Sequence, residues 1–377
     1  MNIVRVNGFS SPLKGGKIVY IPRIIAVDCG NFNVKSKSSR GELQYCNSIR
    51  EKSRFEDEYV FGSDNIKTKT YRLEGKEYVV GSTDPKSRFI LDKNKDRYGA
   101  PDFKLSFIIA VYKHIQFNGE VVRVVTGLPS DHYQNESNYQ KIREDFNSLE
   151  GTHTVNNTTF TIEEIELKLQ PVATLNYLAM NEDGTFKKGG EMYKKSRILI
   201  LDLGMGSTDV TIINNGKYED MYEINYTMYN VYEDILKQTI GLPGENDNPN
   251  ELIAENPTPQ EMEVQIRESL EGEEKKAIFT SGTGKVFEID NIVKGSFELA
   301  ANNILSGLTS RGVVFSTYYA VVFTGGGAKT LLPYLKERLR EHKGDSNIRF
   351  KMPDDLIRAN VRGYYVAAQA NKLKVKH

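Results

Sequence analysis

Four short, predominantly apolar runs interrupt an otherwise mixed chain. Strands that are covered on both faces carry such runs, so the runs predict buried strands. They are Ile24–Val27, Val121–Thr126, Ile198–Asp202 and Tyr319–Phe323. The first, third and fourth each lead directly into a polar, glycine-rich turn. Turns of this kind at the ends of buried strands are where we look for a binding site.

Between and after these runs, the spacing of apolar residues changes to that of helices. We expect helices at 101–116, 134–146, 172–180, 289–308, 331–342 and 360–373. Residues 159–169 alternate between apolar and polar and predict a strand, and Val210–Ile213 is expected to pair with the run before it. Interleaved strands and helices predict an α/β fold whose sheets are flanked by helices on both faces.

Three further segments complete the expected organisation. Residues 1–22 precede the first strand as an extension, and residues 51–100 are polar with short strands such as Tyr78–Val80. Residues 241–263 are rich in Pro, Asn and Glu and predict an exposed insertion.

The three turns share a composition that suits phosphate binding. They read DCGNFNVK from Asp28 to Lys35, DLGMGSTD from Asp202 to Asp209, and TGGGAK from Thr324 to Lys329. Glycine lets backbone N–H groups approach an anion closely. An aspartate at the end of each of the first two strands can hold hydrated Mg²⁺, and Lys35 can reach a phosphate as a point charge. The alternative for each turn taken singly is ordinary strand-to-turn chemistry.

The sequence contains no complete dinucleotide-binding, P-loop or metal-binding motif. The second turn lacks the third glycine of a dinucleotide-binding fingerprint, because Asp209 stands there. The segment Ser281–Lys285 superficially resembles a P-loop, but Phe279 and Val286 replace its first glycine and its Ser/Thr. The five histidines have no metal-ligand spacing.

Composition narrows the class of protein. Fifty basic and 50 acidic side chains give a formal net charge of zero, so no general electrostatic attraction to nucleic acid or membrane is expected. No apolar run is long enough for a transmembrane helix, and the first residues lack the apolar core of a secretory signal. The two cysteines, Cys29 and Cys46, make no disulfide framework. We expect a cytoplasmic protein.

The three turns, in this order, resemble those of the superfamily of actin, sugar kinases and heat-shock chaperone ATPases. The segment 354–364 (DDLIRANVRGY) resembles the "FANxRGF" ending of bacterial plasmid-segregation actins of the ParM and Alp type, with Ile357-Arg358 where those proteins usually have Phe. The resemblance implies an actin-like two-domain fold. Each half would be a mixed sheet flanked by helices, a duplicated ribonuclease-H-like unit, with smaller outer subdomains. Domain I would span 23–170 and 354–377 with 51–100 as outer part, and domain II 171–353 with 216–290 as outer part.

The same resemblance implies ATP or GTP with Mg²⁺ as ligands and assigns roles to residues of this sequence. Asp28 and Asp202 would bind Mg²⁺ largely through water, and Asp202 is also counted with the catalytic residues. Gln170, just before the helix at 172–180, would orient the attacking water. The nucleotide-binding residues would be Gly30, Asn31, Asn33, Lys35, Gly204, Gly206, Ser207, Thr208, Gly325, Gly326 and Gly327. For Thr208 and Asp209 the alternative is hydrogen bonding within the hairpin, and for Gln170 an ordinary first residue of a helix.

The function implied is that of a bacterial ATPase or GTPase whose head-to-tail filaments segregate plasmid DNA. Its partners would be its own copies and a DNA-binding adaptor at a plasmid centromere, with no direct nucleic-acid or membrane contact. Two alternatives from the superfamily stay open. A small-molecule kinase would need a catalytic carboxylate where Gln170 stands, and a chaperone-like ATPase would need a substrate domain after the third turn.

Overall fold

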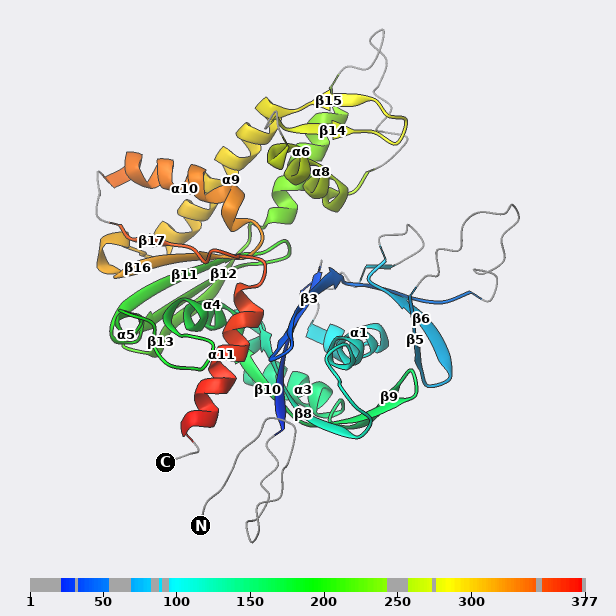
Figure 1. The fold of residues 1–377 in the computed structure, drawn as a ribbon. Coiled ribbons are helices and arrows are strands. Elements are labelled where there is room, and N and C mark those ends of the chain that lie inside the picture. The colour runs from blue at the N-terminus through cyan, green and yellow to red at the C-terminus, as the bar shows by residue number, and fades with distance from the viewer. Residues whose placement is uncertain are drawn as a thin grey trace. The chain divides into compact units, whose positions relative to one another are not determined.

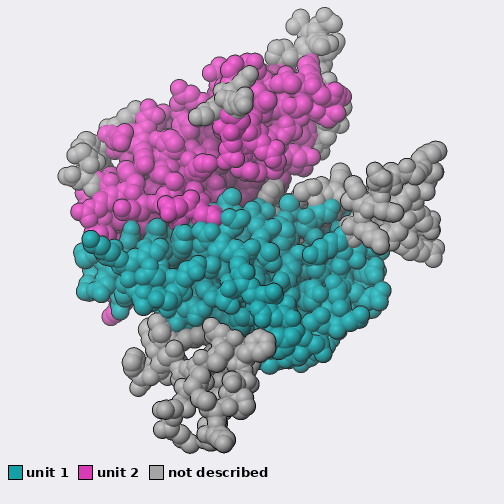
Figure 2. Space-filling model, viewed as in Figure 1, with its two compact units in different colours: residues 1–195, 357–377 teal, residues 196–356 magenta. Residues whose placement is uncertain are grey.

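The computed structural model describes residues 22–30, 33–53, 69–82, 88–89, 95–242, 257–272, 276–343 and 348–374. The chain forms two compact units, Met1–Lys195 with Ile357–His377, and Ser196–Leu356 (Figure 2). The second unit thus begins after residue 195, beyond the expected boundary at 170. The helix at Gln170–Ala179 (α4) belongs to the first unit because it packs along the C-terminal helix Ala359–Lys374 (α11).

The first unit is built on a six-stranded mixed sheet of order β3-β2-β1-β8-β10-β9 (Figure 1). Strands β1, β8 and β10 are parallel, and the pairs β1–β2, β2–β3 and β9–β10 are antiparallel. The bounds are Arg23–Cys29 (β1), Asn33–Ser38 (β2), Gly41–Cys46 (β3), Glu120–Leu128 (β8), Gly151–Val155 (β9) and Thr158–Leu169 (β10).

The middle of strand β1, Ile24–Val27, is apolar because both faces of the strand are covered. Ile25 and Val27 pack in a core with Phe107 of α1 (Pro101–Tyr112). On the opposite face, Ile24 and Ala26 pack with residues of α4 and α11. The remaining elements of this unit are a four-stranded sheet of order β5-β6-β4-β7 and short helices. Their bounds are Ser48–Glu51 (β4), Thr70–Leu73 (β5), Lys76–Val80 (β6), Arg88–Phe89 (β7), Lys95–Gly99 (η1), Ser130–Gln134 (α2), Glu136–Asn147 (α3) and Glu191–Lys195 (α5).

The second unit repeats this plan. Its five-stranded sheet has the order β13-β12-β11-β16-β17, with β11, β16 and β17 parallel and β11–β12–β13 antiparallel. The bounds are Arg197–Leu203 (β11), Thr208–Asn214 (β12), Lys217–Ile224 (β13), Ala320–Thr324 (β16) and Phe350–Lys351 (β17). The helices and the small hairpin are Met228–Ile240 (α6), Pro259–Glu271 (α8), Ile278–Thr280 (β14), Val286–Glu288 (β15), Asp290–Ser310 (α9), Phe315–Thr317 (η3) and Ala328–Lys343 (α10).

Five strands of the first sheet therefore repeat the topology of the second, and β9 is an additional antiparallel strand. In each, a three-stranded antiparallel meander is followed by two parallel strands added on the far side of the first strand. The predicted α/β class and the duplicated arrangement are confirmed. No repeat is visible in the sequence, because the topology depends on the order of strands and not on the identity of side chains.

One prediction is wrong. The exposed insertion expected over 241–263 includes the start of α8, where Thr258 and Glu261 form a reciprocal capping box and Pro259 occupies the first turn. Pro259 and Met262 are buried, so this part of the segment belongs to the core of its unit. The rest of that prediction, residues 243–256, lies outside the described residues, as do residues 1–21 of the expected N-terminal extension.

Candidate functional site

The first turn is the end of the β1–β2 hairpin. Asp28 and Lys35 are direct cross-strand partners, and Lys35 Nζ donates to Asp28 Oδ2 at 3.1 Å. The seven-residue spacing noted in the sequence is therefore the register of the hairpin. Both side chains are largely buried, with exposed fractions of 16% for Lys35 and 9% for Asp28. The two side chains therefore form an ion pair that is largely shielded from water.

The first turn is stabilised by a backbone hydrogen bond within it and by the side chain of Asn47. Gly30 N donates to Asn33 O at 3.1 Å, and a Cβ on Gly30 would meet that same oxygen at 3.1 Å. Asn47 Nδ2 donates to Gly30 O at 2.7 Å, and Asn47 Oδ1 in turn accepts from Ser106 Oγ at 3.1 Å. Sequence reasoning missed Asn47, because a single polar residue between two strands carries no recognisable signal. Asn31 lies outside the described residues.

Cys29, between Asp28 and Gly30, does not act as a nucleophile. Burial and the neighbouring Asp28 raise the pKa of its thiol to about 12. The thiolate, which is the reactive form, is therefore disfavoured at neutral pH.

The second turn joins β11 and β12. Asp202 is buried and lies opposite Asp209 in the register. Gly204 N donates to Ser207 O at 2.9 Å. The Ser207 hydroxyl donates to Asp209 Oδ2 at 2.6 Å, and the Thr208 hydroxyl donates to the Tyr226 carbonyl at 2.7 Å. Both hydroxyls thus make hydrogen bonds within the fold, as the hairpin alternative for Thr208 and Asp209 expects.

The backbone of this turn is oriented by α6. Met228 N donates to Gly204 O at 3.2 Å, and Tyr229 N donates to Met205 O at 3.0 Å. The C=O and N–H of one trans peptide unit point in opposite directions. The N–H groups of Met205 and Gly206 are therefore directed away from α6, which is the arrangement of an anion-binding turn.

The third turn follows β16 and shows why three glycines stand in a row. Gly325 has φ of +86°, and a Cβ there would lie 2.5 Å from Asp202 Oδ1. A Cβ on Gly327 would lie 2.3 Å from Met228 Cγ and 3.1 Å from Leu203 O. Around Gly326, by contrast, nothing lies within 4 Å of a Cβ. The fold therefore requires glycine at 325 and 327, whereas Gly326 leaves an open stretch of backbone.

The second and third turns form one surface of the second unit. Strands β11 and β16 are parallel neighbours with Asp202 opposite Thr324, so both turns follow the same edge of the sheet. Gly327 N also donates to Leu203 O at 3.0 Å. The buried carboxylate of Asp202 and the open backbone at Gly326 therefore lie at the same edge of the sheet, a combination that suits a ligand that carries phosphates and a divalent cation.

Gln170 is the first residue of α4 and directly follows β10. Its neighbour Leu169 is extended and Pro171 occupies the first helical turn, so the helix begins sharply at this point. Strands β1, β8 and β10 run parallel, and therefore Asp28 and Gln170 both come at the same edge of the first sheet. The side chain of Gln170 is half-buried.

The ANVRGY segment begins α11 and serves packing. Asn360 Oδ1 accepts a hydrogen bond from Thr174 Oγ1 of α4 at 2.7 Å. A Cβ on Gly363 would lie 1.8 Å from Ala173 O, so only glycine allows α11 and α4 to approach this closely. The segment thus fixes α4, and with it Gln170, onto the sheet of the first unit.

Comparison with known proteins agrees with this architecture. Residues 26–172 match the family described as "Actin like proteins N terminal domain". No curated protein sequence matches the chain. The crystal structure of the actin-like protein Alp7A superposes with a TM-score of 0.73 at 17% identity, over 94% of this chain and 98% of that one.

Two further solved structures are similar. A 15-stranded ParM filament from Clostridium botulinum gives a TM-score of 0.63 at 19% identity, covering 93% of this chain and 99% of that one. The archaeal actin homolog Ta0583, in complex with ADP, gives 0.63 at 14% identity over 92% and 99%. Residues 26–172 thus match an actin-like family, and the chain shares the fold of its structural neighbours, the ParM and Alp proteins. Within the described residues, no helix is long and apolar enough to cross a membrane.

Proposed function

We propose that this actin-like protein is a nucleoside triphosphatase whose head-to-tail filaments segregate plasmid DNA in the bacterial cytoplasm. The observation that carries the proposal is the duplication of one turn. Asp28 and Asp202 are each the penultimate residue of the first strand of their sheet, and each is followed two residues later by glycine. An acidic, glycine-containing turn of this kind suits a polyphosphate and its cation, and each of the two sheets carries one.

Each residue then has a defined task. Asp28 and Asp202 hold Mg²⁺ through water, and the cation offsets the charge of the phosphates. Lys35, already paired with a carboxylate at 3.1 Å, exchanges that contact for the β- and γ-phosphates. The backbones of Gly30, Asn31, Asn33, Gly204 and Gly206 line the phosphates, with the Ser207 and Thr208 hydroxyls nearby, and the open backbone at Gly326 with Gly325 and Gly327 receives the nucleoside.

Hydrolysis needs little covalent chemistry from the protein. Phosphoryl transfer asks for positioning and charge neutralisation, so a neutral amide can orient the attacking water. Gln170 performs this task from the first turn of α4. The base of the nucleotide, ATP or GTP, is not assigned.

The nucleotide state controls the filament. Contacts to the γ-phosphate favour one conformation of the chain, and head-to-tail contacts between copies in that conformation build an open helical polymer. A solved ParM filament and an ADP complex among the structural neighbours support this proposal. A net charge of zero is compatible with attachment to DNA through an adaptor protein, and it lets copies of the chain associate without long-range repulsion.

Sedimentation and negative-stain imaging test the proposal. The full chain is mixed with Mg²⁺ and ATP, GTP or their non-hydrolysable analogues. We expect pelletable filaments with one of the triphosphates and their loss as phosphate is released. The absence of polymer up to tens of micromolar protein with every nucleotide would refute it.

A variant at Gln170 separates assembly from hydrolysis. Gln170→Ala should still assemble but release phosphate at least about tenfold more slowly, since it lacks the group that orients water. The matched control is Gln140→Ala, which removes an exposed glutamine of α3 that hydrogen-bonds to Glu136. Equal phosphate release by the two variants would contradict the role of Gln170.

A further inference from the structure

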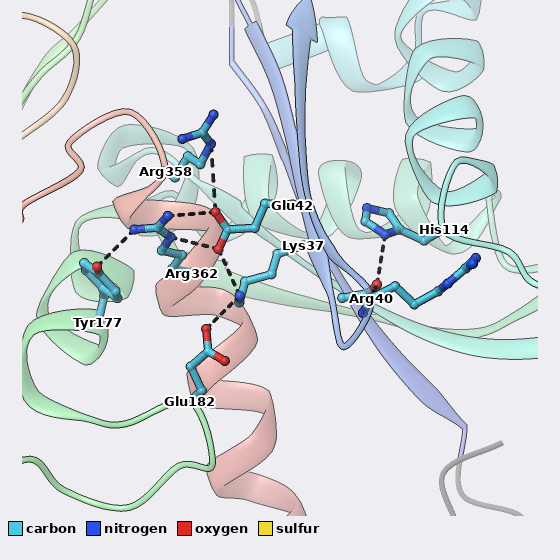
Figure 3. A network of polar contacts seen from close by, with 9 residues as sticks. Lys37, Arg40, Glu42, His114, Tyr177, Glu182, Arg358 and Arg362 are labelled. Carbon is cyan, nitrogen blue, oxygen red and sulfur yellow. Dashed lines mark hydrogen bonds and ion pairs between the residues drawn. The ribbon is translucent and has the colours of Figure 1, made fainter.

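Outside the three turns, one arginine ties together three elements of the first unit (Figure 3). Arg362 of α11 donates from Nε to Glu42 Oε1 and from Nη2 to Glu42 Oε2, both at 2.8 Å. Its Nη1 donates to the Tyr177 hydroxyl at 3.1 Å. Glu42 is on β3 and Tyr177 is on α4. The planar guanidinium fork therefore connects a strand, the C-terminal helix and the helix that begins with Gln170.

The ion pair is partly shielded from water and strongly charged. The side chains of Arg362 and Glu42 are 22% and 19% exposed. Lys37, 7% exposed, adds a second cation at 2.9 Å from Glu42 and also reaches Glu182 at 2.8 Å. Burial alone would raise the pKa of Glu42, but the hydrogen bonds from Arg362 and Lys37 lower it to about 2. The carboxylate is thus ionised at any physiological pH and the pair is permanent.

The contacts on α4 lie along one stripe of that helix. Gln170, Thr174 and Tyr177 are spaced by four and three residues, which places them on the same face. Thr174 contacts Asn360 of α11, and Tyr177 contacts Arg362 of the same helix. The face that carries Gln170 is therefore held by α11 in each of the two turns that follow it.

Packing of the two helices does not by itself explain the arginine. The close approach of Gly363 to Ala173 and the contact between Thr174 and Asn360 already join α4 and α11. Arg362 adds a connection to the β2–β3 hairpin, whose other strand carries Lys35 and Lys37. Since Glu42 lies opposite Lys37 in the register, the fork fixes α4 relative to the strand that bears the phosphate-binding lysine.

We propose that Arg362, together with Glu42 and Tyr177, is a positioning residue for hydrolysis that acts through Gln170. This inference rests on the proposed function. Arg362 sets the rotation and position of α4 relative to the hairpin, and so the place of the Gln170 amide relative to the phosphates. Lys35 is placed by the backbone pairing of β2 with β1, so phosphate binding does not depend on the fork. Loosening the fork lowers the rate of hydrolysis and leaves nucleotide affinity unchanged.

The test compares Tyr177→Phe, which removes only the hydroxyl, with Arg362→Lys, which keeps the charge but loses the fork. For each full-length variant we measure the nucleotide dissociation constant with a fluorescent analogue, the rate of phosphate release and the melting temperature. Tyr177→Phe should slow hydrolysis about threefold to tenfold and Arg362→Lys about tenfold or more, as expected for a displaced catalytic group. The dissociation constant should change by less than about twofold.

A double variant distinguishes positioning from general loosening. If Arg362 and Tyr177 act through Gln170, then adding Tyr177→Phe to Gln170→Ala should slow hydrolysis no further, because coupled residues are not additive. The matched control is Lys195→Gln, which breaks the exposed ion pair with Glu191 in the same unit and should behave as wild type.

The outcomes separate the two proposals. If the wild-type chain hydrolyses no nucleotide, the proposed function fails and the positioning role with it. If the wild type hydrolyses nucleotide and Gln170→Ala is slow, but Tyr177→Phe and Arg362→Lys hydrolyse at the wild-type rate, only the positioning role is overturned. It is overturned as well if the two variants lose affinity with an unchanged rate, or if the double variant is slower than Gln170→Ala alone.

Discussion

Alanine substitutions at the three glycines of the third turn should affect different properties. Two of them should lower stability, and the third should weaken nucleotide binding. The turn is crowded at Gly325 and Gly327 and open at Gly326. A methyl group added at position 325 or 327 therefore tests the stability of the fold. A methyl group added at position 326 tests ligand binding. The three variants control for one another, since they differ only by one step along the chain.

The expected magnitudes follow from the local geometry. Gly325→Ala places an L side chain at φ of +86°, which costs about 1–2 kcal/mol, and puts its Cβ 2.5 Å from Asp202 Oδ1. Crowding of this kind adds about 1–3 kcal/mol, and Gly327→Ala, 2.3 Å from Met228 Cγ, should lose a similar amount. Gly326→Ala meets no atom within 4 Å and should change the free energy of unfolding by less than about 0.5 kcal/mol.

The assays are thermal unfolding without nucleotide and titration with a fluorescent nucleotide. Gly325→Ala and Gly327→Ala should melt earlier than wild type. Gly326→Ala should melt with wild type yet bind nucleotide about tenfold more weakly, because a methyl group intrudes on the proposed nucleoside surface. If Gly326→Ala melts at a lower temperature than wild type, the backbone at Gly326 is not open as the structure indicates. Wild-type affinity in this variant would refute the placement of the nucleoside.

Three other changes have defined outcomes. Gly363→Ala, whose Cβ would lie 1.8 Å from Ala173 O, should lower stability by at least about 1–3 kcal/mol in chemical denaturation. Gly295→Ala, in open space within α9, should instead raise it by about 0.5–1 kcal/mol; destabilisation there would contradict the helix assignment. Burial, with Arg23 and Arg40 nearby, lowers the pKa of His114 from 6.5 to about 4, so the unfolded chain takes up the proton first and stability should fall as pH drops from 6.5 to 4. His114→Asn should flatten that fall, and an unchanged pH profile would show that His114 does not titrate as the structure implies.

Residues 241–263, predicted as an exposed insertion, include the start of a helix that local sequence signals indicate. The start of α8 carries a legible capping box, Thr258 with Glu261, and a proline in the first turn. The abundance of Pro, Asn and Glu around it is typical of an exposed insertion. The start of a helix, however, depends on which residues occupy its first positions and not on the average polarity of the segment. Met262 and Ile266, spaced by one helical turn, are buried and were the apolar evidence for the helix.

The sequence alone determined the elements whose cause is local. Predominantly apolar runs identified β1, β8, β11 and β16, and the glycines after three of them identified the candidate turns. Burial of a strand and tight backbone geometry each demand particular residue types. The seven-residue spacing of Asp28 and Lys35 was visible too, although its cause is a hairpin register.

Tertiary structure alone decided which distant residues meet. The duplicated strand order leaves no repeat in the sequence, since strand pairing uses backbone hydrogen bonds that every residue supplies. The roles of Asn47 beneath the first turn and of Arg362 between Glu42 and Tyr177 depend on contacts across many residues of chain. No local pattern encodes such contacts, because they arise only when separate elements pack against one sheet.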